Sequence, residues 1–348
     1  MAIQSFATQT GRINKIKGEI LAHAVPVEVL GITGAQRLLP ANKGDTVVFR
    51  RYLPFGGVDN RWITPTTAQT FAASHQLSEG VTPAADTVSA TDISVTLQQY
   101  GVLYALTDRT ADLYEDNLAN EMVRQVGERI GEVREMIRYG AVSACTNALY
   151  AGGNSRATVD TVMQLAGLRL AARILKSNHA RQITRILDAS PDFNTAPIEA
   201  GYLVFCHTDL EADIRNLPGF VKTAEYGTRK PINDHEIGSC ESFRFILSPE
   251  LVQHADAGAS VGATGCESTS GVHIDVFPVI IVGEDAWGQV ALRGADSFEA
   301  TYIQPGVKDK NDPLGQRGYI GASFYFNCTV LNQGWLCVYE VGASALTA

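Results

Sequence analysis

The chain has 348 residues, 45% of them hydrophobic, and a formal net charge of −9. This length is enough for two or three domains with a sizeable core. The acidic balance disfavours a protein that reads nucleic-acid sequence, because such proteins usually have a basic surface. The sequence has no run of about 18 apolar residues and no apolar signal-peptide core, so we expect a cytoplasmic protein without membrane contact. The six cysteines are scattered without a C-x-x-C pair, which indicates small apolar core residues rather than a zinc or redox motif.

The first 43 residues are expected to form an N-terminal arm. Residues 1–20 are polar and lack a periodic apolar face, which predicts an extended or partly ordered segment. The stretch 21–39 favours a short helix with Pro26 in its first turn. Basic residues of the arm either face phosphate or bind acidic protein neighbours, and the sequence leaves both readings open.

A projecting hairpin is predicted next, over 44–98. Two β-rich runs, 45–54 and 88–106, flank a long polar stretch. Ile93 and Val95 alternate with polar residues, which is the period-two pattern of a half-exposed strand. Loops this long are uncommon in compact domains unless they have a function. We therefore expect the apolar residues of the hairpin to be covered by another molecule.

The stretch 112–148 predicts one long helix. About 35 helical residues would extend roughly 50 Å at ~1.5 Å per residue, whereas a typical globular helix has about 11–12 residues. Gly127 and Gly131 lie inside it and each costs up to about 1 kcal/mol relative to alanine, so they indicate either close packing or a bend. Apolar residues recur in steps of three and four at Leu118, Met122, Val126, Ile130, Val133, Ile137 and Ala141.

The rest of the chain mixes strands and helices without a regular βαβ repeat, which indicates an α+β fold. A terminal hairpin is expected within 317–341, turning at 331–334. The other expected elements are a helix over 161–177, a strand over 202–206 leading to a helix capped by Thr208 or Asp209, a strand over 243–247, and two strands within 272–294.

Two clusters contain side chains that are capable of catalysis or metal binding. Cys206, His207 and Asp209 carry the groups of a hydrolytic triad, but neighbouring side chains on a strand point to opposite faces. His273 and Asp275 supply two metal ligands where three or four are needed. We therefore expect no catalytic, cofactor-binding or metal-binding residues and no enzymatic activity. A cytoplasmic Cys/His hydrolase is the alternative, and it requires ester hydrolysis that is lost on Cys206→Ala.

The order of these elements resembles the Hong Kong 97-like fold of tailed-phage major capsid proteins. Within that fold the sequence is similar to the N-four-type phage family across most of the chain from Leu39 onward. The segments that carry the resemblance include LPANKGDTVVFRRY, LSEGVTPAADTVSATDISVTLQQYGVLYALTD, ILDASPDFNTAPI, HTDLEADIRNLPGF, YGTRKPINDHEIGSCESFRFILSPEL, HIDVFPVIIVGEDAWGQVAL and NDPLGQRGYIGASFYFNCTVLNQGWL.

The resemblance implies a virion shell protein that forms hexamers and pentamers around double-stranded DNA, with no cofactor. Portal, scaffold or decoration proteins are implied partners, and the bacterial host cytoplasm is the implied place of assembly. An encapsulin-like nanocompartment shell is the alternative within the fold. The implied domains are an N-terminal arm (1–43), an E-loop hairpin (44–98), a peripheral domain with a spine helix (99–155, helix 112–148), an axial domain (156–305) and return strands of the peripheral domain (306–348).

The resemblance also bears on three individual residues. Some proteins of this fold crosslink a lysine to an asparagine, but the hairpin has only Lys43, at its base, so we expect no such crosslink. Spine helices of the fold bend between the precursor and the mature shell. Gly127 and Gly131 are the expected position of that bend.

Overall fold

The computed structural model describes most of the chain from residue 28 onward. The extended segment expected over 1–20, the polar centre of the hairpin at 53–72 and the expected helix start at 112–117 lie outside the described residues. The described residues are 28–52, 73, 75–82, 85, 87–109, 118–183, 200–227, 231–262, 264–293, 298–308, 310 and 312–346.

The described strands form two larger sheets and one two-stranded hairpin. The hairpin pairs β2 (Thr46–Tyr52) with β3 (Ala90–Thr96) in antiparallel register. The five-stranded sheet contains β1 (Ala35–Leu39), β4 (Gln98–Thr107), β11 (Trp287–Leu292), β12 (Glu299–Ile303) and β13 (Arg317–Val330). The seven-stranded sheet contains β5 (Ala148–Tyr150), β6 (Tyr202–Cys206), β7 (Val221–Lys222), β8 (Glu236–Cys240), β9 (Phe243–Leu247), β10 (Phe277–Val282) and β14 (Leu336–Val341).

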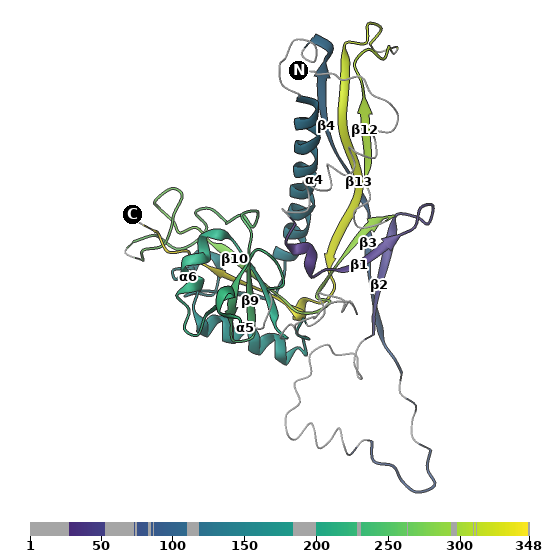
Figure 1. Cartoon of the computed structure of the whole chain (residues 1–348). Coiled ribbons are helices and arrows are strands. Elements are labelled where there is room, and N and C mark those ends of the chain that lie inside the picture. Colours follow the sequence, from purple (N-terminus) through teal and green to yellow (C-terminus); the bar gives the residue numbers. More distant parts are fainter. Residues whose placement is uncertain are drawn as a thin grey trace.

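Three parts of different shape result from this arrangement. The long helix α4 (Leu118–Ser143) runs beside β4, β12 and β13 in an elongated part, and the seven-stranded sheet forms a compact body with α5 (Leu165–Ser177) and α6 (Glu211–Arg215). The β2–β3 hairpin projects away from both (Figure 1). The mixture of helices and strands confirms the predicted α+β class.

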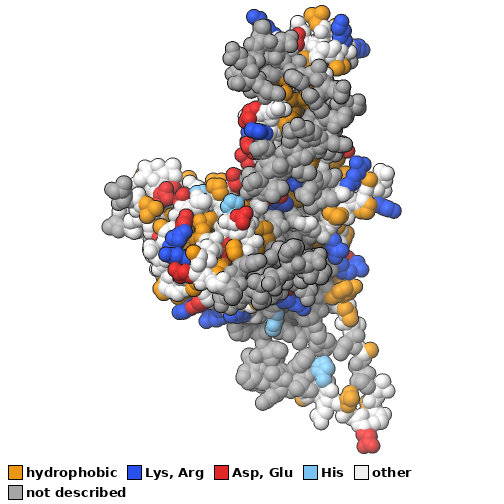
Figure 2. All heavy atoms as spheres, in the orientation of Figure 1, with side chains coloured by type: hydrophobic (Ala, Val, Ile, Leu, Met, Phe, Trp, Pro, Cys, Tyr) orange, Lys and Arg blue, Asp and Glu red, His pale blue; other side chains and the backbone are white. Residues whose placement is uncertain are grey.

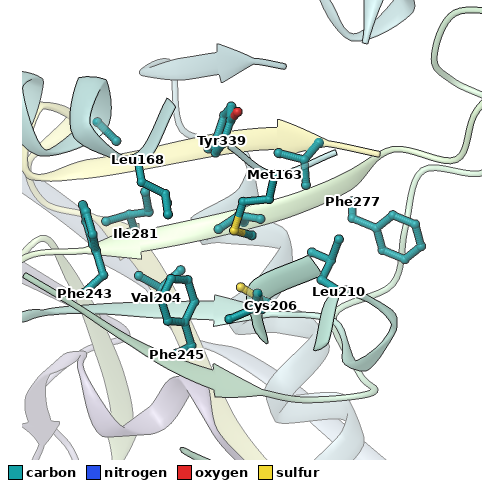
Figure 3. Close-up of a cluster of buried hydrophobic side chains, with 14 of the residues drawn as sticks. Met163, Leu168, Val204, Cys206, Leu210, Phe243, Phe245, Phe277, Ile281 and Tyr339 are labelled. Carbon is teal, nitrogen blue, oxygen red and sulfur yellow. The ribbon is translucent and has the colours of Figure 1, made fainter. Parts of the chain in front are cut away.

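The seven-stranded sheet is covered on both faces. Every residue of β6, β9, β10 and β14 is buried, which explains why these strands are apolar except for Arg244 in β9 and Glu340 in β14. Leu168 of α5 packs with Val204 and Ile281 on one face (Figure 3). Phe205 and Ile280, which alternate with those residues, pack on the other face with the end of α4 and the segment 29–30.

The helix α4 lies along β13 and covers one face of the five-stranded sheet. Val126 and Ile130 pack with Ile320 and Phe324 of β13, so the helical period of the sequence corresponds to a buried face. The helix ends at Ser143 rather than at the predicted residue 148, because Ala148–Tyr150 pair with β14 as strand β5.

The prediction of a terminal hairpin is wrong. The strands β13 and β14 follow each other in sequence and are separated by a short turn, but they belong to different sheets. β13 pairs with β4, β11 and β12, whereas β14 pairs with β5 and β10. The chain therefore crosses from the five-stranded to the seven-stranded sheet between Val330 and Leu336.

Three further predictions need correction. The single strand expected over 88–106 is divided at Leu97 into β3 and β4, which pair with different partners. In the described part of the stretch 21–39, a short 3₁₀ turn at Leu30–Ile32 and the strand β1 replace the expected helix, because β1 pairs in parallel with β11. The turn after β6 is capped by His207, whose side chain accepts a hydrogen bond from the backbone of Asp209, and not by Thr208 or Asp209.

Candidate assembly site

The hairpin is anchored at its root by a small apolar cluster. Phe49 and Val95 are buried against Val290 of β11, while most other residues of β2 and β3 are exposed. A side chain at Gly288 would meet the Phe49 ring at 2.9 Å, so glycine is required there for the close approach. Asn327 adds a hydrogen bond of 2.7 Å to the backbone oxygen of Thr96. The root is therefore fixed to the five-stranded sheet, and the rest of the hairpin is left to project.

A cross-strand ion pair stabilises the register of the hairpin. Arg50 and Asp92 lie directly opposite each other, and two nitrogens of the guanidinium donate hydrogen bonds of 2.8 Å to the two carboxylate oxygens. The hydrogen bond from Arg50 lowers the pKa of Asp92 below its usual 3.8. Both side chains are exposed, so this bidentate pair contributes to register more than to overall stability.

A buried polar network joins residues 28–30, within the expected N-terminal arm, to the middle of α4. Glu135 is fully buried and accepts hydrogen bonds from the backbone nitrogens of Val29 (3.1 Å) and Leu30 (2.9 Å). Glu28 bridges Arg134 and Arg138 at 3.3 and 2.9 Å. Pairing of this kind is needed because an isolated buried charge is costly.

Aromatic rings and one amide complete the surroundings of the two arginines. The guanidinium of Arg134 lies 5.3 Å from the Phe324 ring centroid, and that of Arg138 lies 5.2 Å from the Phe326 ring centroid. Arg138 also donates a hydrogen bond of 3.0 Å to Gln289 of β11. Burial raises the pKa of Glu135, while the backbone hydrogen bond from Leu30 and the charge of Arg138 act in the opposite direction. The network therefore ties α4, β11 and β13 to the start of the described chain.

The sequence did not predict this polar network, although the helical period contains a signal for it. Arg134 and Arg138 follow Ile130 in steps of four, so they fall on the same face as the apolar residues. Charged side chains on a buried face require partners. Glu28 and Gln289 are distant in sequence, and no local pattern connects them to the helix.

The face of the five-stranded sheet that α4 does not cover is a second exposed surface, in addition to the hairpin. The register places Leu103 opposite Gly321 and Ile303 opposite Tyr319, so these side chains point away from α4. Leu103 is 62% exposed and Ile303 is 44% exposed. Contiguous apolar patches, rather than single exposed side chains, mark protein contact surfaces, so these two residues do not by themselves define one.

The structure separates Cys206 from the other two members of the candidate hydrolytic cluster, His207 and Asp209, whose side chains lie 3.0 Å apart. The Cys206 side chain is completely buried among Val204, Leu210 and Phe277 (Figure 3), and burial raises the pKa of its thiol. His207 instead accepts a hydrogen bond of 3.2 Å at Nδ1 from the Asp209 backbone. A buried thiol with a raised pKa is inert as a nucleophile, so these residues are structural.

In the second candidate cluster, Asp275 stabilises a loop. Asp275 is buried and accepts hydrogen bonds of 2.7 Å from the backbone nitrogen of Asp256 and from the Thr269 hydroxyl, while His273 is exposed. Within the part of the chain that the structure describes, no group of three or more His, Cys, Asp or Glu side chains is placed to hold a metal ion. The helices of that same part include none long and apolar enough to cross a membrane.

The sequence matches a protein family over most of its length. The family is described as phage capsid protein, and the match covers residues 90–341. The chain belongs to this family of phage capsid proteins. A curated relative, the major capsid protein of Pseudomonas phage KPP21, is 20% identical to this capsid protein over 273 residues. The alignment covers 71% of this capsid protein and 66% of the relative, so the chain spans slightly less than two thirds of the relative's length.

Solved capsid structures share the fold of this capsid protein. The capsid of Ralstonia phage GP4 superposes with a TM-score of 0.63 at 12% identity, covering 90% of this chain and 88% of that chain. The capsid asymmetric unit of cyanophage Pam1 gives a TM-score of 0.56 at 13% identity, covering 99% and 96%. The head structure of Helicobacter pylori bacteriophage KHP40 gives 0.57 at 11% identity, covering 89% and 87%. This capsid protein therefore has the Hong Kong 97-like fold.

Proposed function

We propose that this chain is the major capsid protein of a tailed phage of the N-four type. Copies of it assemble into hexamers and pentamers of an icosahedral shell that encloses double-stranded DNA. The observation that carries this proposal is the hairpin, which is fixed at its root by Phe49 and Val95 and is otherwise largely exposed. An isolated two-stranded hairpin is only marginally stable in water, so its exposed surface favours a neighbouring molecule as cover.

The presence of two separate sheets supports a division of the shell protein into two main domains. We propose that the five-stranded sheet and α4 form the peripheral domain, and that the seven-stranded sheet forms the axial domain that meets its copies at capsomer centres. Residues 1–43 are proposed as the arm, whose strand β1 pairs with β11 in the five-stranded sheet, and 44–98 as the E-loop that lies over a neighbouring subunit. Three of the ranges expected from the sequence contain strands of both sheets. Within 306–348, β14 pairs with β10 of the seven-stranded sheet; within 156–305, β11 and β12 pair with β13 of the five-stranded sheet; and within 99–155, β5 pairs with β14.

The partners and location of the protein follow from this role. The chain contacts copies of itself through the hairpin and the arm, and portal, scaffold or decoration proteins complete the particle. Packaged DNA lies near the shell without sequence-specific contacts, in keeping with the net charge of −9. The protein assembles in the cytoplasm of the bacterial host, resides in the virion and performs no enzymatic reaction. We also propose that Lys43 forms no covalent crosslink.

Electron microscopy of the expressed full-length chain tests this proposal. Closed particles that contain nuclease-resistant nucleic acid would support a phage shell, whereas closed particles that contain protein cargo would support an encapsulin-like compartment. Deletion of residues 58–76 should leave a soluble subunit that fails to form closed shells. Normal particles from this deletion would contradict the E-loop assignment.

A further inference from the structure

The helix α5 differs from α4 and α6 in the charge of its outward face. Arg169, Arg173 and Lys176 are exposed on α5 and follow one another in steps of four and three residues. Such steps bring side chains to the same side of a helix. The opposite side is buried against the seven-stranded sheet through Leu168 and Leu175. The three cations therefore form a line along the outside of the helix.

A fourth cation, Arg181, follows shortly after the end of α5. Arg181 is exposed, and its backbone oxygen accepts a hydrogen bond of 3.0 Å from the backbone nitrogen of Glu284. Figure 2 shows Lys and Arg side chains along the lower edge of the compact body, where Figure 1 draws α5. We call the four cations the basic stripe; they are Arg169, Arg173, Lys176 and Arg181.

Acidic residues do not balance the basic stripe. Residues 161–183 contain no Asp or Glu, although the whole chain has 37 acidic and 28 basic residues. Glu241, between β8 and β9, accepts a hydrogen bond of 2.8 Å from Arg169. This bond, with a further contribution from the charge of Lys176, lowers the pKa of Glu241. Within the described residues, the side chains of Arg173 and Arg181 form no ion pair, so an excess of positive charge remains.

The other two described helices have balanced charges on their exposed faces. The ion pairs on α4 and α6 join Glu121 with Arg124, Arg129 with Glu132, and Glu211 with Arg215. Neighbouring charges of opposite sign are typical of a solvated helix surface. The excess on α5 is therefore a local feature, and it is opposite in sign to the net charge of −9.

The composition of this surface favours phosphate groups over a protein partner. Protein interfaces usually have an apolar or aromatic core, whereas Leu170, at 38%, is the one large apolar residue of α5 that is exposed. Contacts with nucleic-acid phosphates require cations and no such core, because the release of counterions drives them. The cations on α5 span about 10 Å at ~1.5 Å per residue, which corresponds to about three phosphates of one strand at ~3.4 Å each.

We propose that the basic stripe binds the phosphate groups of double-stranded DNA without reading its sequence. Arg173, Lys176 and Arg181 make the phosphate contacts, and Arg169 remains paired with Glu241. This inference rests on the proposed function as a shell around DNA, and it identifies the surface of the compact body that points toward the DNA. That surface is the face of the seven-stranded sheet covered by α5, opposite to the face that packs on the end of α4.

Binding of the unassembled full-length chain to a short labelled DNA duplex tests the proposal by fluorescence anisotropy. Three phosphate contacts should make the affinity fall about fortyfold between 50 and 200 mM NaCl, because each contact contributes about −0.9 to the slope of log K against log salt. The variant Arg173→Gln/Lys176→Gln/Arg181→Gln should bind at least about tenfold more weakly at 50 mM NaCl and lose most of the salt dependence.

A matched control separates the position of the charges from their number. The variant Arg124→Gln/Arg129→Gln/Arg215→Gln removes the same amount of charge from exposed ion pairs on α4 and α6. It should bind the duplex as the unchanged chain does. Equal losses in the two variants, or no binding by the unchanged chain, would overturn the proposal.

Chemical protection in assembled particles gives a second readout that needs no substitution. An acetylating N-hydroxysuccinimide ester should modify Lys176 and Lys308, which are both exposed. In particles that contain DNA, Lys176 should lose most of the acetylation that it shows in particles without DNA, whereas Lys308, on the loop after β12, should react equally in both. Protection of Lys176 in both kinds of particle would show that a protein surface covers α5, and would overturn the proposal.

The two experiments also distinguish this inference from the proposed function. Closed particles formed by a chain that does not bind the duplex would overturn the phosphate contact and leave the shell function intact. Salt-dependent binding by a chain that never forms closed particles would overturn the shell function and leave the contact between the basic stripe and DNA intact.

Discussion

The carboxylate of Glu135, in the middle of the long helix, accepts a hydrogen bond of 2.9 Å from the backbone nitrogen of Leu30. The two residues are 105 positions apart in the sequence. Leu30 is completely buried, and Val29 beside it donates a second hydrogen bond to the same carboxylate oxygen. The point where the N-terminal arm joins the fold is therefore fixed to the same helix that supports the five-stranded sheet.

Replacing Glu135 with alanine should reduce the free energy of unfolding by about 3 kcal/mol. The change leaves two buried backbone N–H groups unsatisfied and removes a charge that faces Arg138. Glu132→Ala is a matched control, because Glu132 lies on the same helix and pairs with the exposed Arg129. We expect the control to change stability by less than about 0.5 kcal/mol. Urea unfolding of the two variants measures the difference, and equal effects would refute a stabilising role for the network.

Replacing Phe49 with alanine should release the hairpin from the five-stranded sheet. Loss of a buried phenylalanine typically costs about 3–5 kcal/mol, and in this case the loss acts locally at the root. We expect faster amide hydrogen exchange in β2 and β3 with little change in the seven-stranded sheet. Val48→Ala, at an exposed neighbouring position, should leave exchange unchanged. Uniformly faster exchange across both sheets would show that the root is part of the global core.

Acidification should loosen the hairpin through Asp92. The pKa of Asp92 in the folded chain lies below its usual 3.8 because Arg50 donates hydrogen bonds to it. The contribution of this pair to stability is therefore present above pH 3.8 and is lost as the pH falls through the folded pKa. Hydrogen exchange in β2 and β3 should accelerate below pH 3.8 in the native chain, relative to the seven-stranded sheet. The variant Asp92→Asn should show no such step, and an identical step in it would assign the effect to another group.

The glycines of α4 give a prediction about shell maturation. Gly127 and Gly131 are buried within one continuous helix. If they mark a bend, Gly127→Ala combined with Gly131→Ala should give shells that assemble but expand more slowly, because alanine stiffens the helix. Gly140→Ala is the control, since Gly140 is exposed on the same helix and its added methyl group would meet no atom within 4 Å. Time-resolved light scattering of expanding shells measures the rates, and normal expansion of the double variant would refute the bend.

The sequence pattern was sufficient to predict those helices and strands that depend on neighbouring residues in the sequence. The helical period of Val126, Ile130 and their neighbours predicted α4, because a helix buries residues three and four apart on one face. Alternation at Ile93 and Val95 predicted β3 in the same way. The structure also confirms that Cys206 is a core residue, as the scattered cysteines without a C-x-x-C pair indicated.

Strand pairing was predicted less well, because it depends on contacts between distant residues. β13 and β14 are both rich in β-forming residues, and the turn at 331–334 between them has the composition of a hairpin loop. Pairing with β10 nevertheless places β14 in the other sheet. Leu97 likewise gives no sequence signal for the division between β3 and β4, which follows from the separate partners of the two strands.

The sequence by itself determined the α+β class, the long helix, the projecting hairpin and the absence of a recognisable catalytic motif. These properties depend on composition and on periods of two and 3.6 residues, which are set by the local geometry of the backbone. Only the tertiary structure decided which strands pair, which carboxylate satisfies the backbone at Val29 and Leu30, and which surfaces remain exposed. Those outcomes depend on burial and charge pairing between segments that are distant in the sequence, in some cases by more than a hundred residues, and local patterns carry no information about such contacts.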